Sequence, residues 1–156
     1  MLKNNIKIGI CAHSFSSYKS GIGRYAWELF LVLYKSLPNA TFYLYSNRKI
    51  ELPIELDRAI IRSPKNKLEN RMPVYFWLKF LSPFYIKNDK PDFIWSPITL
   101  SPLFYRSKTI VTVHDLNHLL VKETMPFINA IFFKIWFKAD VAGALKRISN
   151  SQSTAN

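Results

Sequence analysis

Short apolar runs alternate with polar, turn-forming stretches along this chain. The first apolar run covers residues 6–11, and apolar positions then recur at helical spacing between Ile22 and Leu37. The first pattern is typical of a buried parallel strand, and the second of an amphipathic helix. A polar loop separates them, and Pro38 follows the helix as a stop. The chain is therefore predicted to open with a strand, a long loop and a helix.

The rest of the chain repeats this alternation. Further strands are predicted from β-branched and aromatic runs at 41–45, 59–62, 93–95 and 109–113. A last strand begins at Ile148. Two more helices are predicted, one over 74–80 between Pro73 and Pro83, and one over 126–145. Strands that alternate with helices predict an α/β fold with a Rossmann-like, doubly wound parallel sheet.

Length and composition indicate one domain with a hydrophobic core. The chain has 156 residues, of which 49% are hydrophobic and 15% aromatic, which argues against a disordered tail. Its single cysteine, Cys11, is expected in the core, and a chain that cannot form an internal disulfide is expected in a reducing cytoplasm. The longest apolar stretch, 126–145, contains Lys134, Lys138 and Asp140, so a membrane-spanning helix is not expected.

The net charge of +12 is large for a chain of this size and widens the range of expected partners. Basic residues are spread from Lys3 to Arg147, which is typical of a solvated surface with a positive field. Nucleic acid, an anionic membrane surface and phosphorylated small molecules all suit such a field, and composition does not choose among them. No known nucleic-acid-binding motif is recognisable, so no specific nucleic acid is expected as a partner.

A glycine-containing motif precedes the second predicted element. Gly21, Gly23 and Ala26 have the G-x-G-x-x-A spacing, in which glycines let backbone N–H groups approach a diphosphate at a helix N-terminus. In dinucleotide-binding folds the first glycine directly follows the strand, whereas residues 12–20 intervene here. The strand at 41–45 also lacks a terminal acid for a ribose, so a dinucleotide cofactor is not expected. The motif is either a phosphate-facing loop beside a cleft or a plain loop that caps a helix.

A second group of polar residues follows the β-branched strand at 109–113. His114 and Asp115 come directly after it, and in a doubly wound sheet such positions line the ligand crevice. The glycine motif leaves the sheet at the same edge, so the two features are predicted to be neighbours. His114 could hydrogen-bond a sugar hydroxyl or a phosphate, or transfer a proton, and Asp115 could orient its ring. The alternative is a structural histidine followed by a capping aspartate.

Metal and two-carboxylate chemistry are not expected. His118 lies four residues after His114, but no further ligand is spaced to complete a metal site. His13, in the first loop, is expected to be exposed. The chain has ten acidic residues, and no paired-carboxylate arrangement stands out among them.

Five segments, taken together and in order, resemble a known family. They are 7–10 (Lys-Ile-Gly-Ile), 20–25 (Ser-Gly-Ile-Gly-Arg-Tyr), 93–97 (Phe-Ile-Trp-Ser-Pro), 109–116 (Thr-Ile-Val-Thr-Val-His-Asp-Leu) and 151–154 (Ser-Gln-Ser-Thr). This set, which covers essentially the whole chain, resembles the family-4 glycosyltransferases of the GT-B fold. The resemblance implies two Rossmann-like domains that face each other across a cleft. The N-terminal domain mainly binds the acceptor, and the C-terminal domain binds the nucleotide sugar.

The resemblance implies a donor-phosphate site at the glycine motif. Gly21 and Gly23 match the loop that approaches the donor diphosphate, and Arg24 lies beside them in the same motif. The nucleotide sugar is a substrate, and the resemblance implies neither a cofactor nor a metal.

The resemblance also implies a catalytic role for the polar residues after the strand at 109–113. His114 matches the histidine that contacts the transferred sugar, and Asp115 follows it in the motif. Ser151 matches the serine of a strand that leads toward the domain's last helix, and it is expected at the cleft. Transfer in this family retains the anomeric configuration.

Residues 1–156 correspond, in this resemblance, to the N-terminal, acceptor-side domain without its closing elements. The family's glutamate-containing donor motif belongs to the C-terminal domain, so the chain alone is expected to be inactive. Two alternatives stay open: a basic nucleic-acid-binding module and a non-functional remnant of a longer gene.

The family's acceptors are glycans or lipid-linked sugars, and the segment 71–90 bears on how such an acceptor would be reached. This segment mixes aromatic residues such as Trp77 and Phe84 with basic ones such as Arg71 and Lys79. Basic residues beside aromatic ones suit peripheral contact with an anionic membrane. The alternative is a core helix packed on the sheet.

Overall fold

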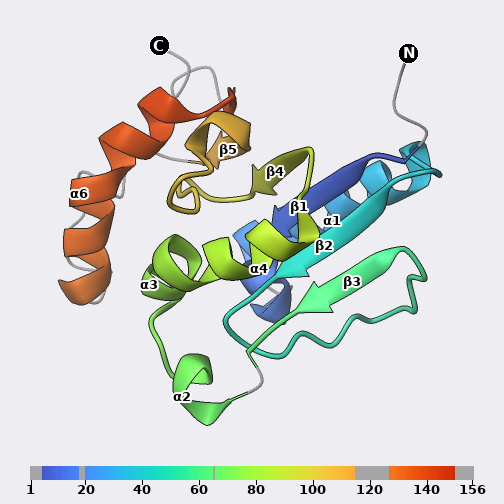
Figure 1. The fold of residues 1–156 in the computed structure, drawn as a ribbon, viewed down its shortest axis with the longest axis horizontal. Helices are drawn as coiled ribbons and strands as arrows, with labels where there is room; N and C mark the ends of the chain where they lie inside the picture. The colour runs from blue at the N-terminus through green and yellow to red at the C-terminus, as the bar shows by residue number, and fades with distance from the viewer. Residues whose placement is uncertain (1–4, 18–19, 65, 115–126, 150–156) are drawn as a thin grey trace.

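The computed structural model describes residues 5–17, 20–64, 66–114 and 127–149, and these form an α/β fold (Figure 1). The strands are β1 (Lys7–Cys11), β2 (Thr41–Tyr45), β3 (Ala59–Arg62), β4 (Phe93–Ser96), β5 (Thr109–Val113) and β6 (Lys146–Ser149). They form one all-parallel sheet in the order β3-β2-β1-β4-β5-β6. This is the order of a Rossmann-like doubly wound sheet, in which the direction of strand addition reverses between β1 and β4. The predicted parallel α/β sheet is confirmed.

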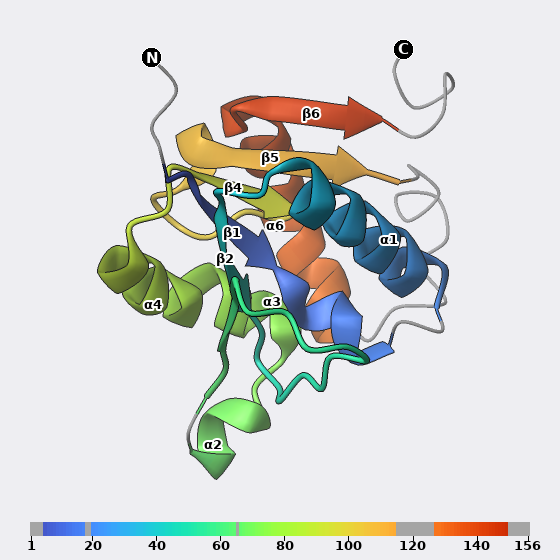
Figure 2. The ribbon, with the colours of Figure 1, turned by 90° about the vertical axis from the view of Figure 1, so that its right-hand side faces the viewer.

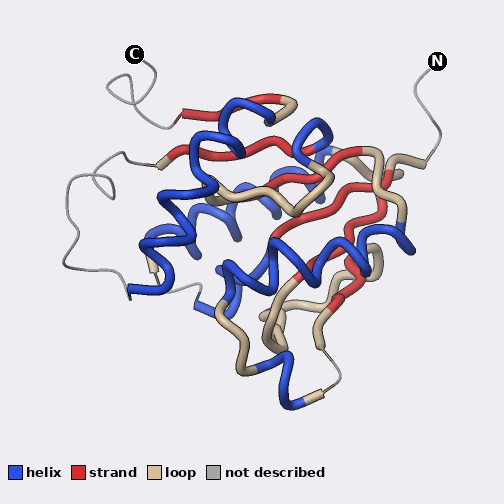
Figure 3. The backbone as a smooth tube through the Cα atoms, turned by 60° about the vertical axis from the view of Figure 1, so that its left-hand side comes forward, coloured by secondary structure: helices blue, strands red, loops and turns tan. Residues whose placement is uncertain are grey.

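Helical segments connect the strands and cover both faces of the sheet. They are α1 (Gly21–Ser36), α2 (Lys67–Asn70), α3 (Val74–Phe76), α4 (Ser82–Asp89), α6 (Phe127–Gly143), a π-helical turn (Trp77–Leu81) and two 3-10 turns (Ala12–Ser17 and Arg106–Lys108). Figure 2 shows α1 on one side of the strands and α3, α4 and α6 on the other. The backbone tube in Figure 3 shows the strands as one layer between these helices.

The core lies on both faces of the sheet because successive strand residues point to opposite faces. In β2, Phe42 and Leu44 pack in the cluster that includes Phe30 of α1. Tyr43 and Tyr45 of the same strand pack in the other cluster, with residues of the π-helical turn and α4. Burial on both faces explains why the central strands β1, β2, β4 and β5 are nearly continuous apolar runs, whereas every residue of the edge strand β6 is exposed.

The helical run from Val74 to Asp89 differs from its prediction. The sequence predicts a helix over 74–80 that Pro83 bends or ends, whereas the chain continues through the π-helical turn into α4. Pro83 has no N–H for the Lys79 carbonyl, which in a regular helix would accept from residue 83. The π-helical turn accommodates the proline. The Lys79 carbonyl instead accepts a hydrogen bond from the Leu103 N–H at 3.0 Å.

This run packs on the sheet through Trp77, Leu78 and Ile86, all of which are buried. The core-helix interpretation of the segment 71–90 therefore describes most of it. Lys79, expected among the basic surface residues, is completely buried, so that expectation is wrong. Phe84 remains on the surface.

The other elements lie close to their predicted positions. β2, β3 and β5 have the predicted bounds, and α1 begins one residue before its predicted start, so the glycine motif lies inside the first helical turn. α2 and the two 3-10 turns were not predicted, because single turns are too short to show a hydrophobic period. Within the described part of the chain, no helix combines the length and the apolar character needed to cross a membrane.

Candidate functional site

The carboxyl ends of β1, β4 and β5 meet at the edge of the sheet where the strand order reverses. β1 leads into the first 3-10 turn and α1, β4 ends at Ser96, and β5 ends at Val113. β1 pairs with β4, and β4 pairs with β5, so the segments that follow these strands are neighbours. Ligands of doubly wound sheets bind in the crevice at this position. This edge is therefore the candidate site.

Ser20 fixes the start of α1 at this edge. Its Oγ accepts a hydrogen bond from the Gly23 N–H at 3.1 Å, and its carbonyl accepts one from the Arg24 N–H at 2.8 Å. Serine is a favoured N-cap residue because its side chain satisfies a terminal N–H group of the helix.

The predicted phosphate-facing residues lie in different surroundings. Gly23 is buried, and its N–H serves the Ser20 cap, whereas Gly21 and Arg24 are exposed in the first turn of α1. A methyl group at Gly21 would meet no heavy atom within 4 Å, and no described glycine has a positive φ. Nothing in the described structure therefore requires glycine at position 21. Gly21 and Arg24 are accessible to an anion at the positive end of the helix dipole.

The ring of His114 is held on two sides. Its Nε2 lies 2.6 Å from the carbonyl oxygen of Pro97, in the segment after β4. Because a carbonyl only accepts hydrogen bonds, the proton is on Nε2, and in the neutral ring Nδ1 is an acceptor. The Tyr25 ring of α1 meets the His114 ring edge-on, with centroids 4.8 Å apart. The glycine motif and His114, predicted as neighbours, are thus joined through Tyr25.

Buried side chains tie the segment after β4 to the end of β5. The Trp95 Nε1–H donates to Thr112 Oγ1 at 3.2 Å, and Thr99 Oγ1 donates to the Thr112 carbonyl at 3.1 Å. The Trp95 ring also meets the Tyr25 ring, at a centroid distance of 6.3 Å. Pro97 and Tyr25 are the two residues that orient His114. These contacts fix both of them relative to the end of β5.

Two titratable groups at the end of β1 are shifted toward their neutral forms. Burial raises the pKa of the Cys11 thiol to about 12, and a hydrogen bond with Ser96 partly opposes this shift. Cys11 is a core residue, as predicted, and a thiol with such a pKa is unreactive. Burial lowers the pKa of His13 to about 4. The prediction that His13 is exposed is wrong, because the 3-10 turn folds it against the sheet and buries its Nδ1.

The described part of this edge has the chemistry of a polar binding site. It presents an exposed helix N-terminus, the guanidinium of Arg24 and the hydrogen-bonded imidazole of His114, which suit phosphate and hydroxyl groups. No group of three His, Cys, Asp or Glu side chains able to hold a metal ion occurs among the described residues. Two predicted site residues, Asp115 and Ser151, lie outside the described residues, and their roles stay predictions.

Sequence reasoning missed the residues that orient His114. Pro97 acts through its main-chain carbonyl, which carries no side-chain signal, although it belongs to one of the five matched segments. Tyr25 lies within the glycine motif, and an aromatic residue one helical turn into such a motif is a usable signal for a contact across the edge.

The fold and this edge define a Rossmann-like α/β domain with a polar site at its switch point. A comparison of the chain with known protein families, with curated proteins and with solved structures finds no significant match. The residues of the edge are therefore the basis for a functional assignment.

Proposed function

We propose that this chain is the acceptor-side domain of a retaining GT-B glycosyltransferase, which transfers a sugar from a nucleotide-sugar donor to a glycan or lipid-linked acceptor. The ordered set of five matched segments supports this proposal. The observation that carries it is the contact between Tyr25 and His114, with ring centroids 4.8 Å apart. It joins the two segments that bear the proposed donor contacts, at the edge where doubly wound sheets bind ligands.

In this proposal the exposed start of α1 faces the donor diphosphate. Transfer breaks the bond between the anomeric carbon and the phosphate oxygen, so negative charge develops on the leaving diphosphate. The positive end of the α1 dipole and the Arg24 guanidinium would stabilise that charge without a metal ion. The absence of a side chain at Gly21 leaves room for the phosphates to approach the backbone.

His114 would contact the transferred sugar. The Pro97 carbonyl holds its Nε2–H, and Tyr25 limits the rotation of its ring. A histidine held in this way keeps one face and one nitrogen in a fixed direction, which suits recognition of a sugar hydroxyl. Asp115 and Ser151 keep their proposed places beside it and along the cleft.

Binding is the appropriate test, because the resemblance assigns most donor contacts to a second domain. Isotope-labelled chain would be titrated with uridine diphosphate glucose while amide and imidazole NMR signals are recorded. We expect millimolar binding that shifts the signals of Gly21, Arg24 and His114. The same titration with free glucose should leave the Gly21 and Arg24 signals in place, because glucose lacks the diphosphate.

Two exposed arginines give a matched pair of variants. Arg24→Gln should weaken the binding, whereas Arg147→Gln, in β6 where the guanidinium bonds the Val141 carbonyl of α6, should not. Shifts centred elsewhere on the protein, or equal effects of the two substitutions, would overturn the proposal. Other nucleotide sugars would be tested in the same way, since the structure does not select the base or the sugar.

A further inference from the structure

Phe104 is the most exposed of the large apolar side chains described, with 85% of its surface open to solvent. Its φ is +68°, in a turn that the Tyr105 N–H closes by donating to the Pro102 carbonyl at 3.1 Å. Such a left-handed position favours glycine or asparagine, because a bulky side chain is strained there. The protein therefore holds a phenylalanine outward in a strained conformation. Strain of this kind, combined with full exposure of an apolar ring, indicates a role in binding rather than in packing.

The turn around Phe104 is fixed to the helices beneath it. The Leu103 N–H donates to the Lys79 carbonyl, which is available because Pro83 cannot donate to it. The Lys79 ammonium is buried and bonds the Asp140 carboxylate of α6. The turn that carries Phe104 is thus anchored to buried contacts between the π-helical turn and α6.

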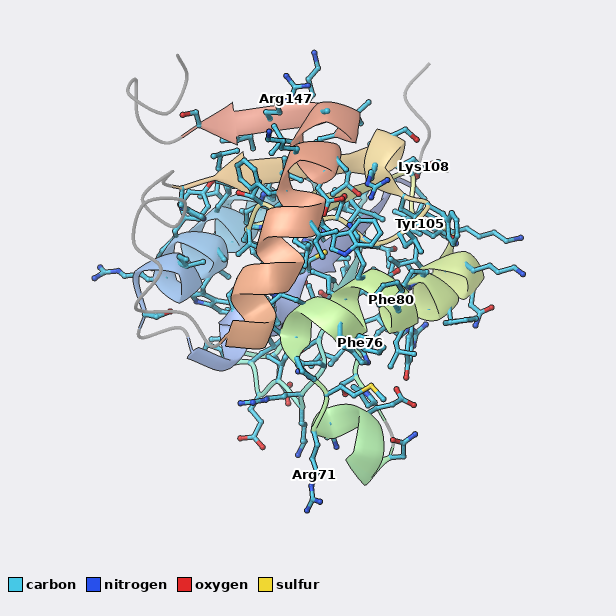
Figure 4. The ribbon with its side chains drawn as sticks, turned by 90° about the vertical axis from the view of Figure 1, so that its left-hand side faces the viewer. Arg71, Phe76, Phe80, Tyr105, Lys108 and Arg147 are labelled. Atoms are coloured by element: carbon cyan, nitrogen blue, oxygen red, sulfur yellow. The ribbon has the colours of Figure 1, made fainter. Side chains whose placement is uncertain are left out.

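Other exposed apolar side chains lie on this side of the sheet. Phe84 of α4 is 68% exposed, and Ile135 of α6 is 61% exposed. Tyr105, next to Phe104, packs in the core cluster on the α4 side. Figure 4 shows Phe76 and Tyr105 on this face, with α6 beside them. We call this surface, which is formed by the exposed parts of residues 71–90, 102–108 and 135–147, the Phe104 face.

The exposed charges on the Phe104 face are all basic. They are Arg71, Lys87, Lys90, Lys108, Lys138 and Arg147. Figure 4 labels Arg71, Lys108 and Arg147 along this face. Its two acids, Asp89 and Asp140, are buried and bonded to Arg62 and Lys79. One partly exposed acid, Glu69, borders the face beside Phe84, where it accepts a hydrogen bond from the Tyr85 hydroxyl at 3.1 Å.

The exposed acids described lie on the opposite side. They are Glu28 of α1 and Glu51, Glu55 and Asp57, between β2 and β3. That segment packs on the α1-side cluster through Ile50. The described surface is therefore divided into an acid-bearing α1 side and a basic Phe104 face.

We propose that the Phe104 face docks on the surface of an anionic lipid bilayer. The rings of Phe104 and Phe84 enter the boundary between headgroups and acyl chains, and the basic residues contact the lipid phosphates. A strained exposed phenylalanine and a surrounding set of basic residues that outnumber the one bordering acid, Glu69, suit this partner. The inference does not depend on the proposed glycosyl transfer.

A nucleic acid or a second copy of the chain fits the face less well. Single-stranded nucleic acid needs a groove along which its backbone runs. Neither of the two hollows described on the protein is a basic groove, because Glu69 lines one of them and Glu55 and Asp57 line the other. A symmetric pair of copies joined through this face would place one basic face against another.

Vesicle co-sedimentation tests the proposal with the full chain. We expect binding to vesicles of phosphatidylglycerol mixed with phosphatidylcholine, weaker binding at high salt, and little binding to phosphatidylcholine alone. Phe104→Gly removes the ring and relieves the backbone strain, so it should leave the melting temperature unchanged or higher. It should weaken partitioning about tenfold, as expected for the loss of one buried aromatic ring. Lys108→Glu should weaken it to a similar degree, about tenfold.

Matched variants on the acid-bearing side are the controls. Ile54→Ser removes a half-exposed apolar side chain, and Lys49→Glu reverses an exposed charge, and neither should change vesicle binding. A dye attached to the Phe104→Cys variant should brighten on anionic vesicles, and one attached to Ile54→Cys should not. The buried Cys11 thiol does not compete for the label.

Four results would overturn the proposal. They are equal binding to neutral vesicles, unchanged binding of Phe104→Gly, binding to single-stranded DNA without binding to vesicles, and a dimer in sedimentation velocity that Phe104→Gly dissociates. The last two would assign the face to nucleic acid and to a second copy, respectively.

Discussion

Lys79 and Asp140 form a completely buried ion pair between the π-helical turn and α6, with the ammonium 2.5 and 2.6 Å from the two carboxylate oxygens. The Arg106 Nε donates to the same carboxylate at 2.7 Å. The Trp136 ring lies against both cations. Burial lowers the pKa of Lys79, and the hydrogen bond to Asp140 opposes this shift. Two cations share one carboxylate, so Asp140 is the centre of the cluster.

This arrangement predicts that the two partners are not equivalent. Asp140→Leu leaves Lys79 and Arg106 without a counter-charge, and we expect a loss of about 3–5 kcal/mol in the free energy of unfolding. Lys79→Met leaves Asp140 bonded to Arg106, so a smaller loss of about 2 kcal/mol is expected. Urea denaturation followed by circular dichroism measures both. A larger loss for Lys79→Met than for Asp140→Leu would contradict the prediction.

An exposed ion pair provides the control for this comparison. Lys49 and Glu51 are 3.3 Å apart, with side chains that are mostly open to solvent. Lys49→Met should change the free energy of unfolding by less than about 0.5 kcal/mol.

The wild-type transition is also informative, since a gradual, non-cooperative loss of structure would favour the interpretation of the chain as a non-functional remnant.

The central strands could be predicted because their side chains are buried on both faces. The run at 109–113 is β-branched throughout, and the run at 41–45 is β-branched or aromatic except for Leu44. Such runs are typical of strands that helices cover on both sides. The course of residues 74–89 could not be predicted in the same way. Pro83 suggests the end of a helix, and only a tertiary partner, the Leu103 N–H, explains how the helical run continues past it.

The parts of the candidate site that depend on sheet topology could be predicted from the sequence. The parts that depend on the burial of individual side chains could not. The approach of His114 to the glycine motif follows from the rule that parallel strands end at one edge. The burial of His13 depends on how the 3-10 turn packs, and a polar loop gives no sign of that. Similarly, Lys79 is a lone charge in an apolar run, for which a surface position is the usual expectation, and its partner Asp140 lies far along the chain.

The buried imidazole of His13 should make the folded protein less stable in mild acid. Its folded-state pKa of about 4 lies below the ordinary value of 6.5, so the unfolded chain binds more protons between these values, and stability falls as the pH is lowered. Since one pKa unit corresponds to about 1.4 kcal/mol, the loss between pH 6.5 and 4 is about 3 kcal/mol. Urea denaturation across this range should show a steeper decline for the wild type than for His13→Gln. Parallel curves would show that His13 does not contribute.

Two glycines predict opposite effects of the same substitution. A methyl group at Gly9 would lie 2.9 Å from Cε2 of the Tyr45 ring and 3.2 Å from Cγ1 of Ile94, so Gly9→Ala should destabilise the protein by about 1–3 kcal/mol. Gly21 has open space and a helical backbone, so Gly21→Ala should stabilise it by about 0.5 kcal/mol. Thermal unfolding measures both changes.

The same Gly21→Ala variant bears on the proposed donor site. If phosphates approach the backbone at this position, the added methyl group should weaken binding of uridine diphosphate glucose although the fold is more stable. A gain in stability with unchanged binding would argue against a diphosphate at Gly21 and in favour of a plain helix-capping motif.

The contact between Tyr25 and His114 predicts which property of the tyrosine matters. The edge-on packing needs an aromatic ring but not the hydroxyl group, so Tyr25→Phe should preserve the ring-proton shifts of His114, and Tyr25→Ala should change them. The Pro97 carbonyl is present in all three proteins, so His114 should keep its proton on Nε2, which long-range proton–nitrogen NMR spectra detect directly. Loss of the Nε2–H form in Tyr25→Ala alone would show that Tyr25 also maintains the hydrogen bond to Pro97. Loss of it in the wild type would contradict the geometry proposed for the site.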